Sequence, residues 1–557
     1  MTKPPIKRAT RTQWNSRREE KQRRLARIAP YIEGKLVQRD SIVMVLEALL
    51  HSGDRVALEG DNQKQADFLS RALAQVDAAR VNDLHLLIPS LARAEHLTLF
   101  ERGIARRVDF CFAGPQSVRV AQLLEEGKLE IGSIHTYVEL YARMLVDLTP
   151  RVALVCAEQA DQAGNLYTGA NTEDTPTIIE AAAFGHGVVL AQVNEVVDEL
   201  PRVDIPGSWV DLVVTADRPY ALEALFTRDP ARISERQVLM AMLVIRGIYE
   251  RHGVTSLNHG IGFATAAIEL LLPTYGESLG LKGRICRNWV LNPHPTLIPA
   301  IESGWVESVH CFGSEAGMEQ YVRARADVFF VGADGSLRSN RTLAQLAGQY
   351  GVDLFIGSTL QMDADANSST VTLGRLAGFG GAPNMGHDPR GRRHTSPAWL
   401  SLITAGAPVV RGRKLVVQIV ETSRNGVPAF VESLDAVEVG RRDGMPIAPV
   451  MIYGDDVSHV VSEEGIAYLY RAQGSEERRA ALAAIAGATP IGRCADPQRT
   501  ASLRARGIVA YPEDLGVQRN EARRPLLAAQ SIDELIDWSG GLYQPPDHLR
   551  GVARAEG

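Results

Sequence analysis

The chain has 557 residues, of which 45% are hydrophobic and 23% charged, and its formal net charge is −6. This length exceeds what one hydrophobic core organises, so we expect two large domains of an ordinary folded protein. The nearly balanced charge argues against nucleic acid as a partner of the whole chain, and no apolar run reaches the ~18 residues that a membrane span needs.

Residues 1–40 form a basic segment. Ten Lys or Arg residues and only two acidic ones, Glu19 and Glu20, lie between Lys3 and Arg27. Such a run is found in nucleic-acid-binding arms, in transit peptides and in docking tails. The segment lacks the apolar face that a presequence needs, so we interpret it as a solvated helix or tail that docks a partner.

Residues 41–228 alternate short apolar runs with helical patterns, which is typical of successive β-α-β units. Parallel strands joined by helices are the expected outcome, so we predict an α/β domain with a mainly parallel sheet. The expected strands are Arg55–Glu59, Leu84–Ile88, Val108–Phe112, Val152–Cys156, Gly187–Val193 and Val210–Val214, and the expected helices are Lys64–Ala74, Val118–Leu124 and Ile178–Ala183.

A charge cluster with a proline, Leu225–Arg232, precedes a long helical pattern over Gln237–Tyr249. We therefore place the domain boundary after residue 228. Residues 229–557 repeat the α/β alternation, become helical and charged after Glu463, and end in an irregular C-terminal extension. The expected strands of this domain are Ser308–Phe312, Asp327–Val331, Leu354–Ile356 and Leu415–Val420.

The segment Ser256–Phe263, Ser-Leu-Asn-His-Gly-Ile-Gly-Phe, predicts a glycine loop that opens a helix. Gly260 and Gly262 carry no side chain that would keep a ligand from the backbone, and the helix N-terminus offers N–H groups with partial positive charge. The loop therefore favours an anionic or carbonyl oxygen. A dinucleotide site would need a third glycine, where Thr265 stands, and a later acidic residue. A purely structural turn is the alternative.

Other patterns carry less chemistry. Leu376–Gly386 is rich in glycine, so we expect a loop that lines the site. Gly276–Gly280 fits the G-x-S-x-G expression of hydrolases, but it lacks the strand-to-helix context of a nucleophile. The cysteines at 111, 156, 286, 311 and 494 form no C-x-x-C pair, which favours buried thiols in a reducing cytoplasm and indicates no metal site.

Motifs in both halves resemble those of the CoA-transferases, and more narrowly those of the alpha chains of malonate decarboxylase and citrate lyase. The resemblance covers residues 45–490, and the chain length and the basic opening around Trp14 are most similar to the malonate decarboxylase alpha chains. The motifs are Ala157–Leu166 (with Asp161, Gly164 and Asn165 of a D-x-x-G-N turn), Val189–Val197, Ile205–Asp211, Asn258–Phe263, Gly378–Gly386 and His459–Ala467.

The resemblance implies an α/β fold of two tandem CoA-transferase-like domains with mainly parallel sheets flanked by helices, in a cytoplasmic multisubunit enzyme. The implied reaction converts acetyl-S-acyl carrier protein and malonate into malonyl-S-acyl carrier protein and acetate. The thiol would belong to a phosphoribosyl-dephospho-CoA arm of the carrier protein, with CoA as its analogue, and no cofactor would be bound covalently to this chain. Separate subunits would perform the decarboxylation, and an acidic carrier would suit the basic N-terminal segment.

Such a reaction runs through a mixed anhydride and two tetrahedral oxyanions, so the site needs hydrogen-bond donors and a cation for the second malonate carboxylate. Arg287, Arg338 and Arg375 are unranked candidates for that cation. Asn258 fits an amide donor and a residue that satisfies its own backbone equally well. The expected catalytic residues are Asn258, Gly260, Ile261, Gly262 and Phe263, and the expected substrate- or thioester-binding residues are His259, Arg287, Asn288, Gly378, Gly380, Gly381, Asn384, Gly386 and His387.

Two other functions stay open. Family members that form a glutamyl intermediate carry a Ser-Glu-Asn-Gly motif shortly after the glycine loop, whereas Arg287–His294 occupies that interval here and contains no glutamate. Ser314–Gly317 is similar but lies later, so a free-CoA transferase or thioesterase with Glu315 as nucleophile is one alternative, with a helix-start acid as its structural interpretation. The other is a non-catalytic scaffold subunit that binds CoA-like groups.

Overall fold

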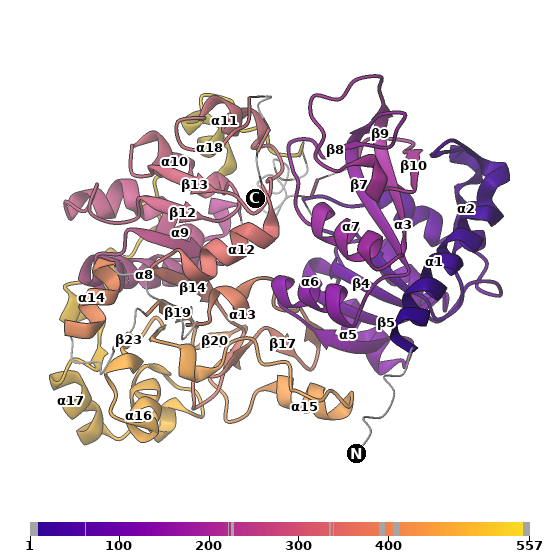
Figure 1. The fold of residues 1–557 in the computed structure, drawn as a ribbon. Coiled ribbons are helices and arrows are strands. Elements are labelled where there is room, and N and C mark those ends of the chain that lie inside the picture. The colour runs from indigo at the N-terminus through magenta and orange to yellow at the C-terminus, as the bar shows by residue number, and fades with distance from the viewer. Residues whose placement is uncertain are drawn as a thin grey trace, which may run out of the picture. The chain divides into compact units, whose positions relative to one another are not determined.

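The computed structural model describes residues 9–61, 63–220, 222–223, 228–333, 336–337, 339–388, 396–404, 413–547 and 549. It divides into two compact units, Met1–Leu222 and Glu223–Gly557. Each unit is built around one mainly parallel sheet flanked by helices, as the sequence predicted (Figure 1). The basic N-terminal helix belongs to the first unit, and the division falls shortly before the expected boundary at residue 228.

The first unit has the strand order β1-β2-β10-β9-β7-β3-β4-β5-β6, with β8 paired to β7. All pairs are parallel except β1–β2 and β7–β8. The strands are β1 Ile32–Glu33, β2 Leu36–Val37, β3 Arg55–Leu58, β4 Leu84–Ser90, β5 Ala105–Phe112, β6 Glu130–Ile134, β7 Val152–Ala160, β8 Leu166–Tyr167, β9 Val188–Val196 and β10 Leu212–Thr215. The helices are α1 Ala9–Ile28, α2 Ile42–Leu49, α3 Asp67–Leu73, α4 Ala94–Glu101, α5 Ser117–Glu125, α6 Tyr137–Val146 and α7 Thr175–Phe184.

The core of the first unit follows from its apolar strand runs. Small and β-branched side chains of β3, β7 and β9 are fully buried, and the apolar faces of α6 and α7 cover them in one cluster. Strands buried on both faces read as continuous apolar runs rather than alternating ones. This explains why every strand predicted in residues 41–228 is present, with ends that differ by a few residues.

The second unit has the strand order β13-β12-β11-β14-β19-β22-β23-β24, parallel from β13 to β22. The strands are β11 Ser256–His259, β12 Asn288–Val290, β13 Ser308–His310, β14 Leu354–Ser358, β19 Leu415–Ile419, β22 His459–Val461, β23 Ile466–Ala467 and β24 Val509–Ala510, with hairpins β15 Gln361–Met362/β16 Ser368–Ser369, β17 Val371–Thr372/β18 Arg375–Leu376 and β20 Ser423–Arg424/β21 Val427–Pro428. The helices are α8 Glu235–Val244, α9 Phe263–Leu271, α10 Ile298–Glu302, α11 Glu319–Ala324, α12 Arg341–Tyr350, α13 Ala382–Met385, α14 Pro397–Thr404, α15 Asp435–Arg442, α16 Ser475–Ile485, α17 Pro497–Ala505 and α18 Ile532–Trp538.

Two expectations for the second unit need correction, and one short strand is missing from the sequence prediction. Asp327–Val331 is not a strand, because only isolated bridges join Phe329 to Val309 and Val331 to Leu337. The glycine-rich segment at residues 376–386 is not all loop, since α13 lies within it. Strand β12 was not predicted, because three residues are too few to show a period.

The glycine loop lies where the strand order of the second sheet reverses. From β11 the chain first adds β12 and β13 on one side, and then adds β14 and β19 on the other. In open α/β sheets, ligands bind at the carboxyl ends of the strands at such a switch point. The loop after β11 and the end of β14 border this point.

None of the five cysteines forms a disulfide in the structure. Cys111, Cys156 and Cys286 are buried, and burial raises the pKa of Cys156 and of Cys286 well above the ordinary value, so these thiols are poor nucleophiles. Cys494 is exposed. Among the described residues, no helix has the length and apolar character to cross a membrane.

Candidate functional site

The glycine loop joins β11 to α9 at the carboxyl edge of the second sheet. The Gly260 N–H donates to Ile356 O of β14 at 2.7 Å, so it continues the sheet and is not available to a ligand. The N–H groups of Ile261 and Gly262 have no acceptor among the described residues. The Thr265 hydroxyl lies 2.7 Å from Gly260 O and 2.9 Å from Gly262 O, which fixes the loop.

The loop is also held close to β14. A Cβ on Gly260 would lie 3.1 Å from Gly357 Cα, and one on Gly262 would lie 2.9 Å from Ser358 Oγ. A side chain at Gly260 would therefore press on the backbone of β14, and one at Gly262 would displace the Ser358 hydroxyl. The two available N–H groups stand beside the N-terminus of α9, whose partial positive charge favours an anionic oxygen.

Behind the loop, a buried polar network centres on Glu269 of α9. Its Oε1 lies 3.0 Å from His259 Nδ1 and 2.9 Å from His294 Nδ1, and Oε2 accepts from the Thr296 hydroxyl. His259 Nε2 in turn lies 2.8 Å from the Tyr249 hydroxyl. Both ring nitrogens of His259 thus have protein partners, and this side chain positions the end of β11 rather than lining a ligand site.

The network sets its own protonation. Burial alone would raise the pKa of Glu269, but the neighbouring His294 and His259 outweigh it and hold that pKa well below its usual range. Burial, together with the charge of Arg228, lowers the pKa of His294 to about 4. At neutral pH the cluster therefore contains a carboxylate that accepts from a neutral His294.

The expected amide donor of Asn258 is engaged elsewhere. Its Nδ2 donates to Val290 O of β12, and the residue is buried. The side chain therefore ties β11 to β12, which is close to the structural interpretation, although the partner is a neighbouring strand and not its own backbone.

Arg287 and Asn288 lie at the opposite edge of the sheet from the loop. In the parallel register Asn288 pairs with Ser256, the first residue of β11, whereas the loop follows the last residue of that strand. Arg287 is half-exposed and binds Glu307 through Nε and Nη2 at 2.6 and 2.8 Å. Asn288 Oδ1 accepts from the Ser308 hydroxyl at 2.8 Å. This geometry does not favour either as a substrate ligand.

The other two candidate arginines give no support either. Arg375 lies on hairpin strand β18 and is exposed. Arg338 lies outside the described residues. The hydrolase-like Ser278 is exposed and donates to Tyr275 O at 2.7 Å in a helical turn, so it lacks the strand-to-helix context of a nucleophile.

The second glycine segment packs against α12 rather than against the first loop. Gly378 O accepts from Thr370, and a Cβ on Gly381 would meet the Gln345 side chain of α12. Gly380 has a φ of 58°, which favours glycine. Asn384 also contacts α12, since its Nδ2 donates to Gln345 O. Gly386 and His387 contact a later segment instead, because a Cβ on Gly386 would meet Ile452 and His387 Nδ1 lies 3.2 Å from Asp456. No backbone–backbone hydrogen bond joins this segment to Asn258–Phe263 within the described structure.

One charged pair at the carboxyl edge was missed from the sequence. Arg228 and Glu315 are 1% exposed each, and Arg228 Nε lies 3.6 Å from Glu315 Oε2. In the sequence, Arg228 lies in the charge cluster that marks the domain boundary, and Glu315 fits either an alternative nucleophile or a helix-start acid. A basic residue beside a proline in a linker gives no local signal for burial, so only the tertiary structure reveals this pair.

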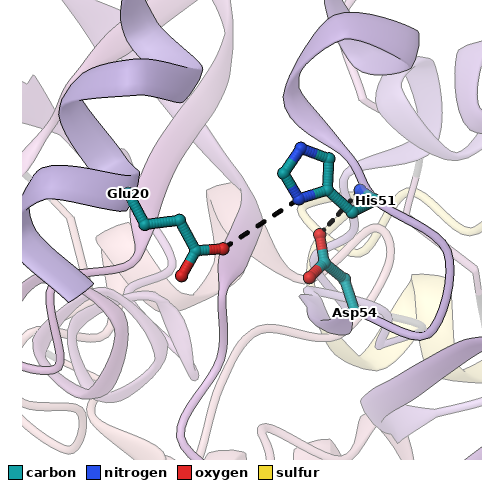
Figure 2. A group of neighbouring side chains, drawn as sticks. All are labelled: Glu20, His51 and Asp54. Carbon is teal, nitrogen blue, oxygen red and sulfur yellow. Dashed lines mark hydrogen bonds and ion pairs between the residues drawn. The ribbon is translucent and has the colours of Figure 1, made fainter. Parts of the chain in front are cut away.

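A second cluster, in the first unit, invites a metal interpretation. Glu20, His51 and Asp54 offer three ligand atoms within 4.8 Å of one another (Figure 2). The Arg24 guanidinium already lies among them, since Nη2 donates to Glu20 Oε1 at 2.5 Å and to Asp54 Oδ1 at 3.0 Å and lies 3.0 Å from His51 Nδ1. The cluster thus contains its own cation, and it ties α1 to the end of α2.

Comparisons with known proteins bear on this geometry. Residues 13–552 match the family model described as "Malonate decarboxylase, alpha subunit, transporter". The acetyl-S-ACP:malonate ACP transferase of Malonomonas rubra is 55% identical over 93% of this chain and 95% of its own length.

Solved structures agree. A chain of a Pseudomonas malonate decarboxylase hetero-tetramer in complex with malonate is 65% identical, covers 98% of this chain and 100% of its own length, and superposes with a TM-score of 0.93. The putative alpha subunit of citrate lyase from Streptococcus mutans, at 16% identity, 92% and 87% coverage and a TM-score of 0.56, shares the fold. The chain therefore belongs to the family of malonate decarboxylase alpha subunits.

Proposed function

We propose that this chain exchanges acetate for malonate on the thiol of an acyl carrier protein. The observation that carries the proposal is the pair of available N–H groups at Ile261 and Gly262, placed at the switch point of the second sheet in a member of this family. The related transferase bears this activity in its name. We further propose that this thiol belongs to a phosphoribosyl-dephospho-CoA arm of the carrier protein.

Each step conserves atoms and charge. A malonate carboxylate oxygen adds to the acetyl thioester carbonyl, and the tetrahedral oxyanion collapses with release of the carrier thiolate and formation of an acetyl-malonyl anhydride. The thiolate then adds to the malonyl carbonyl, and acetate leaves. No covalent bond to the protein forms in this sequence.

The loop supplies what the two addition steps need. Each tetrahedral intermediate places negative charge on one oxygen, and fixed backbone donors stabilise such an oxygen without reorganising. The N–H groups of Ile261 and Gly262 can serve both intermediates in turn, because the two carbonyl carbons of the anhydride are joined through one oxygen. Holding carboxylate and thioester together in a site that excludes water contributes up to about 7–11 kcal/mol in favourable cases.

Label exchange tests the proposal. The full-length chain is mixed with carrier protein that bears a labelled acetyl group and with unlabelled malonate, citrate or acetate. Release of labelled acetate is then followed. We expect malonate-dependent release together with malonyl-loaded carrier. An intact acetyl-carrier thioester in the presence of malonate would overturn the proposal and leave the scaffold function.

One observation favours a second candidate, in which Glu315 is a nucleophile that forms a glutamyl thioester. The structure buries Glu315 at the same edge of the sheet as the glycine loop. Glu315→Gln separates the two functions, because a nucleophile cannot be replaced by an amide. Retained turnover and an unmodified peptide in mass spectrometry after quenching support the direct transfer, whereas lost turnover and a trapped adduct in the parent chain support the covalent one.

We also propose that α1 contributes to the docking face for an acidic carrier. Arg18, Arg23 and Arg27 are exposed along this helix. Steering by exposed charges acts on association and is screened by salt. Reversal of all three to glutamate should raise the KM for the carrier and invert its salt dependence, because salt then screens a repulsion, with kcat unchanged. An unchanged KM for the carrier would place docking elsewhere.

A further inference from the structure

The buried guanidinium of Arg228 has donors without acceptors. Its Nε and Nη2 atoms are inaccessible to solvent and have no hydrogen-bond partner within the described part of the chain. Buried polar groups are nearly always hydrogen-bonded, and an ionised donor left unpaired in a protein interior is costly. An exception of this kind calls for a ligand or a functional role.

Nε and Nη2 form the edge through which arginine binds a carboxylate with two parallel hydrogen bonds. This chain uses that edge repeatedly on its surface. Arg143, Arg287 and Arg479 each bind a neighbouring carboxylate through Nε and Nη2, with distances of 2.6–3.0 Å. In Arg228 the same edge is buried and unpaired, because Glu315 lies 3.6 Å from Nε and makes no such two-point contact.

The unpaired edge lies at the same end of the second sheet as the proposed reaction site. Glu315 follows β13 and His294 follows β12, so both stand at the carboxyl edge of the sheet where the glycine loop lies. Arg228 faces Glu315, and its charge acts on His294. One short turn later, the Arg232 guanidinium carbon lies 5.4 Å from the ring centre of Phe263, which begins α9.

We infer that Arg228 binds the carboxylate of malonate that does not react, through its Nε and Nη2 edge. This inference rests on the proposed function, and it assigns the cation that the sequence could not identify. A dicarboxylate held at one end by Arg228 would present its other end toward the loop. Acids without a second carboxylate would lack this anchor, so the arginine acts on substrate specificity.

Glu315 has a defined part in this arrangement. While the site is empty, its carboxylate opposes the buried guanidinium at 3.6 Å and limits the cost of burying it. When malonate arrives, the two carboxylates share one cation, and their mutual repulsion weakens binding. Removal of the Glu315 charge should therefore tighten the binding of malonate, which is the opposite of what removing a substrate ligand would do.

The test compares malonate with malonamate, in which one carboxylate is replaced by a neutral amide of the same size. The full-length chain is assayed with acetyl-loaded carrier protein and either acid. Arg228→Lys keeps the positive charge, and hence the pairing with Glu315, but loses the two-point edge. We expect the KM for malonate to rise about 10- to 100-fold, as for loss of a hydrogen bond to a charged group, while the KM for malonamate changes less than about threefold.

Two further variants keep the test decisive. Glu315→Gln should lower the KM for malonate and leave that for malonamate unchanged. Arg479→Lys, which alters an exposed two-point pair with Asp365, should change neither. Equal rises for both acids in Arg228→Lys, or an unchanged KM for malonate, would overturn the assignment. Unfolding curves of each variant identify any that fails to fold, and the double variant Arg228→Gln/Glu315→Gln then removes both charges together and should still lose the preference for malonate.

Failure of the proposed function can be told apart from failure of this inference. If the parent chain transfers no acyl group to malonate, the proposed function fails. Isothermal titration of the parent chain and of Arg228→Lys with malonate and with malonamate still examines Arg228. A preference for malonate that is lost in the variant would support the carboxylate site, and equal binding of both acids by the parent chain would overturn it.

Discussion

The two sheets reverse their strand order in the same way, yet their carboxyl edges are filled differently. In the first unit the reversal lies between β3 and β7, where the buried Glu59 accepts from Cys156 N at 2.7 Å and from the Thr175 hydroxyl at 2.6 Å. In the second unit the corresponding place holds a glycine loop with the open N–H groups of Ile261 and Gly262 among the described residues. The strand order makes the carboxyl edge of both sheets suitable for ligand binding. In the first unit, however, the Glu59 side chain occupies this place and accepts the hydrogen bonds of its neighbours.

The largest expected effect comes from adding a side chain to the glycine loop at the carboxyl edge of the second sheet. Gly260→Val places side-chain atoms against Gly357 and pushes the loop away from β14, so both open donors move. Loss of one such donor typically lowers kcat about 10²- to 10³-fold, and we expect at least ~100-fold for acetate release.

Gly374→Val is the matched control, because no heavy atom of the described structure lies within 4 Å of a Cβ at that position. Steady-state kinetics of both variants, with unfolding curves to confirm folding, make the comparison. A Gly260→Val chain that turns over at the parent rate would show that the open donors do not serve the reaction.

The buried Glu59 at the carboxyl edge of the first sheet should make the first unit less stable as the pH rises. Burial raises the pKa of Glu59 to about 7. A carboxyl group with a raised pKa in the folded state contributes stability that is complete below its unfolded value near 4.5 and is lost as the pH rises to about 7. The loss is about 3 kcal/mol at 1.36 kcal/mol per pKa unit.

Native-state hydrogen exchange at β3 and β7, corrected for intrinsic rates, measures the free energy of unfolding of this unit between pH 4.5 and 7.5. The uncharged Glu59→Gln should flatten the profile, although its single amide oxygen can accept from only one of the two donors, Cys156 N and the Thr175 hydroxyl. A parent profile that is already flat would contradict the raised pKa.

The second unit should show the opposite slope. Because the pKa of His294 is lowered to about 4, its contribution is complete above pH 6.5 and is lost as the pH falls toward 4. The size is about 3 kcal/mol at 1.36 kcal/mol per pKa unit, and the pKa of about 4 already includes the opposing effect of Glu269. As the pH rises, hydrogen exchange corrected for intrinsic rates should therefore become slower at β11 and β12. Over the same pH range it should become faster at β3 and β7. His294→Gln should remove this dependence, and parallel slopes in the two units would contradict it.

The sequence predicts local features of this comparison and misses those that depend on register or tertiary contacts. The glycine loop is a local pattern, and the apolar runs of the first sheet are long enough to identify. Whether Arg287 and Asn288 face the loop depends on which end of β12 they occupy, and that strand has only three residues. The pairing of Arg228 with Glu315 joins segments far apart in the chain, so no spacing rule could reveal it. Asn258 lies within β11, and the direction of its amide follows from the neighbouring strand β12.

The smallest expected effect tests whether the stability of helix α8, which packs against the helix that follows the glycine loop, can be lowered without a change in kcat. Ser234 caps α8, where its hydroxyl accepts from Gln237 N at 3.3 Å and its N–H donates to Gln237 Oε1 at 3.0 Å, and α8 packs against α9. Ser234→Ala should lower the free energy of unfolding of the second unit by about 1 kcal/mol, as for loss of a helix cap. Urea unfolding followed by exchange at β11 measures this, with β3 as the internal reference, and kcat should stay at the parent value. If Ser234→Ala also lowers kcat, the N–H groups of Ile261 and Gly262 depend on α8 for their position. The carboxyl edges of the two sheets would then differ in rigidity as well as in the groups that occupy them.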